Sequence, residues 1–363
     1  MAECLPTRIL CTIFYHPYGG HVIKNCSLLL TAFFALVVTV APIQQAYAAD
    51  YVWKLAHEEL PGGFMDSVAH EFGKKLAEKS NGNIKLEVYP SGTLGTSEDL
   101  VELTQHNAIQ FNFADAGHLG TQIPQVQALL LQYLFPSDMN VVKQVLNEGS
   151  FMELLTPKFH EKNLEPLVNL TEGWQVWSTN RPISKPSDFN DFKMRTMSSK
   201  LLVESYAAYG ANPTPIPFSE VYSALQLKMV DGQENPVFAI YDMKFYEVQQ
   251  NIIFGYTGPF VLTLISNKAF IDSLPEDIRA IALEAARECI AYGFNWQDKF
   301  NASRLEKMKQ AKKDLNIKHL TEEEMQEFKT LAKKTHEVYF NIGGEGAKEI
   351  LSALQADIKK FSK

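Results

Sequence analysis

The sequence predicts an α/β protein built as two lobes, each with its own sheet. Strands alternate with helices from Tyr51 onward, which is typical of parallel sheets covered by helices on both faces. The chain crosses between the lobes twice, at 173–180 and again after Tyr256. Two crossings form a hinge, so we expect the ligand site in the cleft between the lobes.

Composition and charge narrow the class of protein. The chain has 363 residues, of which 46% are hydrophobic, so it can bury two cores of ordinary size. Its formal net charge is −8, with 34 basic and 42 acidic side chains and no basic block. This balance gives no reason to expect nucleic acid or anionic lipid as a partner.

Residues 1–48 have the features of a cleavable signal peptide. Lys24 precedes an apolar run at 28–40, and Ala46-Tyr47-Ala48 is a small-x-small cleavage site, so we expect the cut between Ala48 and Ala49. The run is shorter than the roughly 20 apolar residues of a membrane span, which favours export over anchoring. Only Cys289 follows this cut, so the mature chain is expected to have no intrachain disulfide.

The first third of the mature chain is predicted as strand, helix, strand, helix, strand. A strand at 51–57 is followed by a helix at 64–80, which ends at Asn81-Gly82. Residues 83–89 alternate as a second strand, a helix capped by Thr96 or Ser97 covers 97–106, and 109–115 is a third strand. Ligands lie beyond the carboxyl ends of such strands, so the polar side chains there are candidates: His57, Glu58, Ser97 and Asp115.

The remaining elements complete two lobes joined by a long helix. We expect helix at 140–162, strands at 166–170, 192–197 and 260–266, and closing helices at 321–340 and 345–361. Between Pro275 and Lys313 there is no proline, so one helix of roughly 55 Å is possible. A break at Gly293 is the alternative, since an interior glycine costs about 1 kcal/mol relative to alanine. The predicted lobes are 49–172 with 261–300, and 173–260 with 301–363.

Arg195 is the main candidate for ligand binding. It ends a short strand, and a guanidinium held there offers a planar fork that grips a carboxylate or sulfonate at two points. Around it are Arg195-Thr-Met197, PIPFSEVYSALQ at 215–226 and VDGQENP at 230–236, with YPSGTLG at 89–95 and KFYEVQ at 244–249. This ordered set resembles the solute-binding subunit of tripartite ATP-independent periplasmic (TRAP) transporters, of the dicarboxylate-binding type.

The resemblance implies a two-lobed, type II-like periplasmic binding protein with an unbroken helix behind both lobes. It implies a monomeric periplasmic receptor that closes on a small organic anion and delivers it to the small and large TRAP membrane subunits, without cofactor or metal. The family's anion-binding arginine falls on Arg195 and its asparagine on Asn235. Its other ligand contacts fall on Glu58, Ser97, Asp115, His118, Ser198, Ser199 and Phe218.

Two of these positions have alternative roles. Asn235 precedes Pro236 and could simply cap the helix that follows. Phe218 could be core instead of a platform for the ligand.

The second lobe departs from one pattern of the family. Many sugar-acid and dicarboxylate binders carry a second arginine in G-x-R, whereas this chain has Gly173-Trp174-Gln175. Gln175 offers a neutral amide, so a second carboxylate on the ligand would be desolvated without a cation. We therefore expect one anionic group, on a monocarboxylate, hydroxy acid, keto acid or sulfonate. Trp174 or Trp177 is expected to form a wall of the site.

An exported hydrolase is the alternative from another class of protein. The sequence has no G-x-S-x-G, no phosphate-binding G-x-x-x-x-G-K and no C-x-x-C motif. Two cleft carboxylates such as Glu58 and Asp115 could still hydrolyse a glycoside, because their defining feature is a separation in space. Glu58, Glu59 and Asp115 could equally accept hydrogen bonds from ligand hydroxyls or an amine.

Overall fold

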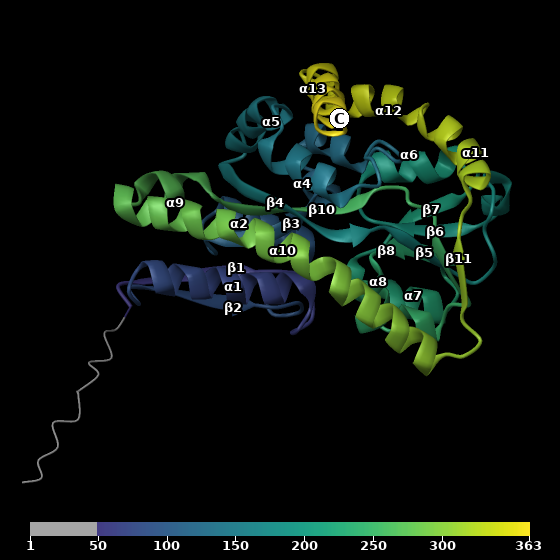
Figure 1. Ribbon diagram of the computed structural model, residues 1–363, viewed down its shortest axis with the longest axis horizontal. Coiled ribbons are helices and arrows are strands. Elements are labelled where there is room, and N and C mark those ends of the chain that lie inside the picture. The colour runs from purple at the N-terminus through teal and green to yellow at the C-terminus, as the bar shows by residue number, and fades with distance from the viewer. Residues whose placement is uncertain (1–48) are drawn as a thin grey trace, which may run out of the picture. The chain divides into compact units, whose positions relative to one another are not determined.

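The computed structural model describes residues 49–363 (Figure 1). The predicted leader and its cleavage site fall before this range, outside the described residues. Residues 49–363 contain two sheets, as predicted. No helix within this range is both long and apolar enough to cross a membrane.

The first sheet has five strands in the order β2-β1-β3-β10-β4. β1 is parallel to β2 and β3, but β10 is antiparallel to both of its neighbours, so the prediction of a wholly parallel sheet is wrong. The reason lies at the hinge, where Pro259 pairs with Trp174: the chain leaves along β4 and returns beside it along β10. The strands are β1 (Tyr51–Ala56), β2 (Ile84–Tyr89), β3 (Phe111–Asp115), β4 (Leu164–Trp174) and β10 (Pro259–Asn267).

The second sheet has six strands in the order β11-β9-β5-β8-β6-β7. It is mixed as well, because β5, which carries the chain into this lobe, is antiparallel to β8 and β9. β6 lies parallel to β7 and β8 and carries Arg195. The strands are β5 (Val176–Thr179), β6 (Lys193–Thr196), β7 (Asn212–Pro215), β8 (Gly232–Asn235), β9 (Asn251–Phe254) and β11 (Asn316–His319).

The long helix α10 (Glu276–Ala311) runs unbroken for 36 residues, which overturns the alternative of a break at Gly293. It packs against α1 and β4 of the first lobe and against α8 of the second (Figure 1). A Cβ at position 293 would lie 2.9 Å from Leu170 Cδ2 and 3.3 Å from Phe64 Cζ. The glycine therefore allows α10 to approach β4 closely.

Two segments predicted as single helices are each divided. Residues 140–162 form α4 and α5, because the α5 N-terminus is capped from a distance: Asp357 Oδ2 accepts a 2.9 Å hydrogen bond from Phe151 N. Residues 321–340 form α11 and α12, with a turn at Lys333-Lys334. The other helices are α1 (Phe64–Lys79), α2 (Ser97–Gln105), α3 (Ala116–Leu119), α4 (Met139–Glu148), α5 (Phe151–His160), α6 (Lys200–Ala208), α7 (Val221–Gln226), α8 (Val237–Asp242), α9 (Lys268–Ser273), α11 (Glu322–Ala332), α12 (Thr335–Gly343) and α13 (Ala347–Phe361), with short 3-10 turns at Pro124–Leu130, Pro186–Phe189, Phe218–Glu220 and Phe245–Glu247.

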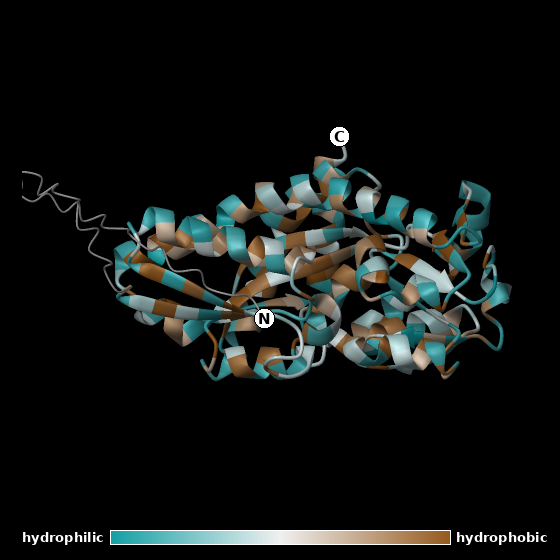
Figure 2. Ribbon diagram, turned by 90° about the horizontal axis from the view of Figure 1, so that it is seen from below, coloured by the Kyte–Doolittle hydropathy of each residue, from teal (hydrophilic) through white to brown (hydrophobic). Residues whose placement is uncertain are grey.

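The largest buried cluster surrounds the first sheet and includes residues from the end of the chain. Ile350, Leu351 and Leu354 of α13 belong to it, and α13 packs on α4 and α5. The predicted assignment of 301–363 to the second lobe is therefore wrong for its last helix. In Figure 2 the helices carry both hydrophobic and hydrophilic residues, as expected for helices that bury one face against a sheet and expose the other to solvent.

Candidate functional site

Arg195 is buried on β6 with part of its guanidinium unpaired. Its side chain is 2% exposed, and its Nε donates a 2.9 Å hydrogen bond to the carbonyl oxygen of Ile216. Nη2 is also buried but has no hydrogen-bond partner within residues 49–363. Burial lowers the pKa of Arg195 to about 10, while the nearby carboxylates of Glu58 and Asp115 oppose that shift. The guanidinium is therefore charged at neutral pH and has a free donor.

A cavity lies beside this guanidinium. It has an empty volume of about 300 Å³, a value that includes the part open to solvent. Carboxylates and apolar side chains share its wall with one arginine, one histidine and one asparagine. The lining residues are Glu58, Glu59, Met65, His118, Glu172, Arg195, Met197, Phe218, Asn235, Ala239 and Phe260.

Asn235 ends β8 and faces this cavity, and it does not cap the next helix. α8 begins after Pro236, and its first turn is capped from α10, where Asn301 Oδ1 accepts a 3.0 Å hydrogen bond from Phe238 N. The Asn235 amide instead donates to Gln233 Oε1. The alternative of helix capping is therefore wrong, and the asparagine lies on the same cavity wall as Arg195.

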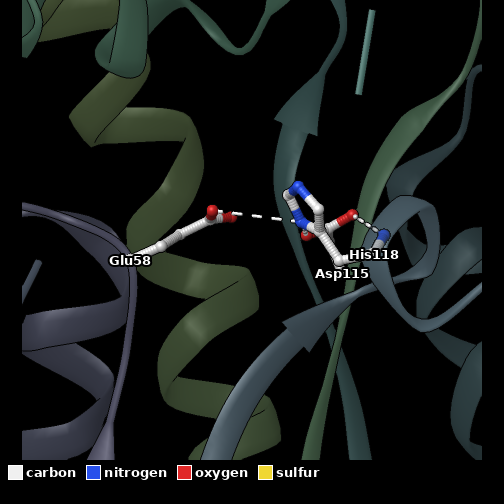
Figure 3. A group of neighbouring side chains, drawn as sticks. All are labelled: Glu58, Asp115 and His118. Carbon is white, nitrogen blue, oxygen red and sulfur yellow. Dashed lines mark hydrogen bonds and ion pairs between the residues drawn. The ribbon is translucent and has the colours of Figure 1, made fainter. Parts of the chain in front are cut away.

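Glu58, Asp115 and His118 meet at the first-lobe side of the cavity (Figure 3). Asp115 Oδ1 accepts hydrogen bonds from Gly117 N (2.7 Å) and His118 N, and its Oδ2 contacts His118 Nδ1. Both oxygens are thus engaged within its own loop, and Asp115 does not line the cavity. It orients His118, whose Nδ1 lies 4.0 Å from Glu58 Oε2.

This trio is also the group within residues 49–363 whose ligand atoms lie close enough to hold a metal, all within 4.8 Å of one another. The charges of these side chains favour an ion pair between His118 and the two carboxylates over a metal site. Burial alone would lower the pKa of His118, but the carboxylates of Asp115 and Glu58 outweigh burial and raise it to about 9. A protonated imidazole has no free lone pair for a metal.

The raised pKa of His118 predicts a loss of stability in alkali. A group whose pKa is raised by folding stabilises the protein below its ordinary value of 6.5, and this contribution disappears as the pH rises through about 9. The full effect is at most on the order of 3 kcal/mol. We expect urea unfolding to show the wild type exceeding His118→Gln by more at pH 7 than at pH 10. An equal difference at both pH values would contradict the ion pair.

Glu59 and Glu172 form a second acidic group in the cavity wall. Glu59 lies on the loop after β1, and its Oε2 accepts a 2.8 Å hydrogen bond from Met65 N. A Cβ at Gly63 would lie 2.4 Å from that same oxygen, so this glycine makes room for the carboxylate. Glu172 lies near the end of β4. Both carboxyl groups line the same cavity, and each acts on the pKa of the other.

The three serines that were predicted as ligand contacts form hydrogen bonds with other side chains of the protein. Ser97 donates to Glu58 Oε2 and lines an adjoining cavity that shares Glu58 and Phe218 with the first. Ser199 caps α6 and donates a 2.8 Å hydrogen bond to Gln127 Oε1. Ser198 donates to Glu98 Oε1 at 2.7 Å, from the second lobe to the first. Neither Ser198 nor Ser199 lines the Arg195 cavity.

The two candidates at the first crossing lie away from the Arg195 cavity. Gln175 lines a separate hinge cavity together with Gln132 and Glu234. Trp174 packs edge-on against Tyr256, with 6.2 Å between ring centroids, and faces a different groove. The chain turns sharply after Glu172, so it is that glutamate that reaches the cavity wall.

The sequence interpretation missed several residues of the cavity wall. Glu172 could have been recognised as a candidate, because a glutamate inside an otherwise buried strand is unusual. Glu59 was considered only as a possible hydrogen-bond acceptor. The others are apolar residues whose neighbours are set by the tertiary fold: Met65, Met197, Ala239 and Phe260.

Comparison with known families and proteins identifies the class of receptor. Residues 55–341 match the family of bacterial extracellular solute-binding proteins, family 7. The ectoine-binding periplasmic protein TeaA of Halomonas elongata is 35% identical over 85% of this chain and 90% of its own length. The ectoine/5-hydroxyectoine-binding protein UehA of Ruegeria pomeroyi is 31% identical over 84% of this chain and 90% of its own. The C4-dicarboxylate-binding protein DctP of Rhodobacter capsulatus is 34% identical over 76% and 83%.

Solved structures that resemble this chain belong to the same class of receptor. The ectoine-binding protein of the TeaABC TRAP transporter of Halomonas elongata superposes with a TM-score of 0.82 at 34% identity, over 85% of this chain and 99% of its own. A TRAP solute-binding protein of Desulfovibrio salexigens with bound orotic acid also gives 0.82, at 27% identity, over 86% and 99%. These relatives are receptors and not enzymes, which overturns the alternative of an exported hydrolase. The chain belongs to the family 7 extracellular solute-binding proteins and is a periplasmic solute receptor of the TRAP type, as the sequence motifs predicted.

Proposed function

We propose that this receptor binds a small organic solute through one anionic group, which pairs with Arg195 and is flanked by Asn235. The observation that carries this proposal is the buried Nη2 of Arg195, which has no partner and borders an empty cavity. A buried donor without a partner costs free energy in the empty protein, on the order of 1–3 kcal/mol. A carboxylate or sulfonate in the cavity would supply the missing hydrogen bond and charge.

The opposite wall favours a ligand that also carries N–H donors. Glu58, Glu59 and Glu172 all face the cavity, where their oxygens can accept hydrogen bonds from N–H groups of a ligand. A zwitterion with one carboxylate and one protonated nitrogen suits both walls. The names of two relatives, which bind ectoine, support this class of solute over dicarboxylates.

Transport is the expected use of this binding. The lobes close around the solute, and the loaded monomer delivers it to the small and large TRAP membrane subunits. A relative assigned to the TeaABC TRAP transporter supports this pairing with membrane components. Periplasmic relatives support the same location for this chain, and the leader at 1–48 would direct it there.

A thermal-shift screen tests the ligand class. The panel pairs ectoine with an amine-free monocarboxylate, a sulfonate and succinate. We expect ectoine-like zwitterions to raise the melting temperature most, monoanions without nitrogen to raise it less, and succinate least. Strong stabilisation by succinate would contradict the single-anion assignment, and no stabilisation by any anion would contradict the role of Arg195.

The hydrogen bond between Ser198 and Glu98 gives a smaller prediction. It joins the lobes at a partly exposed position, so we expect Ser198→Ala to weaken solute binding about threefold, corresponding to roughly 0.5–1 kcal/mol. Isothermal titration calorimetry measures this directly. Ser273→Ala, at an exposed helix end, is the matched control, and an equal effect of both substitutions would contradict a role in closure.

A further inference from the structure

Glu59 and Glu172 are two buried carboxyl groups that line the same cavity and act on each other's pKa. Their side chains come from separate elements, the β1–α1 loop and the end of β4, and are 5% and 2% exposed as residues. Oε1 of each has no hydrogen-bonding donor from residues 49–363. Each therefore retains an unsatisfied oxygen beside the space that the solute would occupy.

No basic side chain of residues 49–363 forms an ion pair with either carboxyl group, as the charges that act on them show. Glu58 on the same loop and Asp242 on α8 act on Glu59, and Glu58 and Asp115 act on Glu172; all of these are acidic. Two neighbouring buried carboxyl groups cannot both ionise in such surroundings, so the pair holds at least one proton at neutral pH.

The basic groups of the neighbouring elements are engaged elsewhere. His57, which precedes Glu58, contacts Asp66 of α1, and burial lowers its pKa to about 4, so its ring is neutral. His118 after β3 pairs with Asp115. Arg195 on β6 lines the same cavity, and its Nε is bonded to the Ile216 carbonyl. No basic side chain of these elements is therefore available to take the place of the proton on Glu59 and Glu172.

We propose that Glu59 and Glu172 share a proton while the cavity is empty and release it to solvent when a protonated N–H group of the ligand binds in its place. This inference rests on the proposed function for the Arg195 site. The exchange is balanced, because the ligand keeps its own proton and donates a hydrogen bond, while the carboxyl proton leaves. The pair thereby selects ligands with a cationic end and links their binding to pH.

The direction of the pH effect follows from the same geometry. Burial raises the pKa of Glu59 to about 8, and burial together with Glu59 raises the pKa of Glu172 further above its ordinary value. The pair therefore keeps a proton at pH 7, and this proton competes with the ligand. Affinity for a protonated amine is expected to rise from pH 6 to pH 8, whereas affinity for an anion without nitrogen is not.

Calorimetry in two buffers tests the exchange, with ectoine as the probe. At pH 7, buffers with different heats of ionisation should report release of up to about one proton per bound ectoine. The variant that combines Glu59→Gln with Glu172→Gln should bind more weakly and release almost none, because no carboxyl proton is left at this wall. Glu87→Gln, in β2 outside the cavity, is the matched control and should release as much as the wild type. Equal heats in both buffers, or unchanged release in the double variant, would overturn the proposal.

Infrared spectroscopy tests the shared proton without any ligand. The empty wild type at pH 7 should show a protonated carboxyl band that titrates near pH 8 and is lost when Glu59→Gln and Glu172→Gln are combined, or is reduced in Glu172→Gln alone if the double variant does not fold. Absence of the band in the wild type overturns the proposal even if ectoine binds. If the band is present but no anion of the panel binds, the proposed function fails instead, and ligand exchange at the pair fails with it.

Discussion

Replacing Arg195 with alanine is expected to lower the affinity for the bound solute by roughly 30-fold to several-thousand-fold, corresponding to about 2–5 kcal/mol. The alanine leaves the solute's anionic group desolvated without its charged partner. The fold should survive, because within residues 49–363 Arg195 makes one hydrogen bond, from Nε to the Ile216 carbonyl, and its buried Nη2 has no acceptor. Titration calorimetry measures the affinity, and thermal unfolding of the empty protein measures the fold.

Two further variants separate charge from geometry. Arg195→Lys keeps the charge but loses the fork, so its affinity should lie between those of the alanine variant and the wild type. Arg181→Ala removes an exposed arginine of the same lobe and should leave binding unchanged. If Arg195→Ala binds like the wild type, the guanidinium does not hold the ligand.

Replacing Trp177 with alanine is expected to destabilise the protein by about 3–5 kcal/mol, the range for removal of a large buried aromatic side chain. Trp177 is 1% exposed and packs against Phe189 and Phe328, with ring centroids 5.2 and 5.3 Å away. Its indole N–H donates a 2.7 Å hydrogen bond to Tyr206 Oη, which would also be lost. Urea unfolding at neutral pH gives the change in free energy.

Trp174→Ala is the matched control for this prediction. Trp174 is only half-buried, at the edge of a groove, so its loss should cost clearly less. If the two tryptophans contributed equally, Trp177 would not be the centre of the second-lobe core. The sequence left open which tryptophan faces the cleft, and the structure places neither of them on the Arg195 cavity.

Much of the candidate site could be predicted because its side chains follow strand ends. Arg195 and Asn235 lie on the neighbouring strands β6 and β8 and line the same cavity, as their motifs suggested. Glu58 and His118 follow β1 and β3 in the other lobe. Ser199 and Asp115 were predicted as ligand contacts, but their oxygens are already used by nearby backbone and side-chain donors. Local hydrogen bonds of this kind cannot be read from residue type alone.

The sequence by itself determined most of the order of strands and helices and the identity of the receptor family, because periodicity, capping residues and motifs are local properties of the chain. Only the tertiary structure decided that β10 and β5 run against their neighbours, that α13 packs with the first lobe, and that Glu59 meets Glu172. Those outcomes depend on which distant segments pack together. Glu59 and Glu172 are separated by more than a hundred positions, and only folding brings their carboxyl groups to one cavity wall.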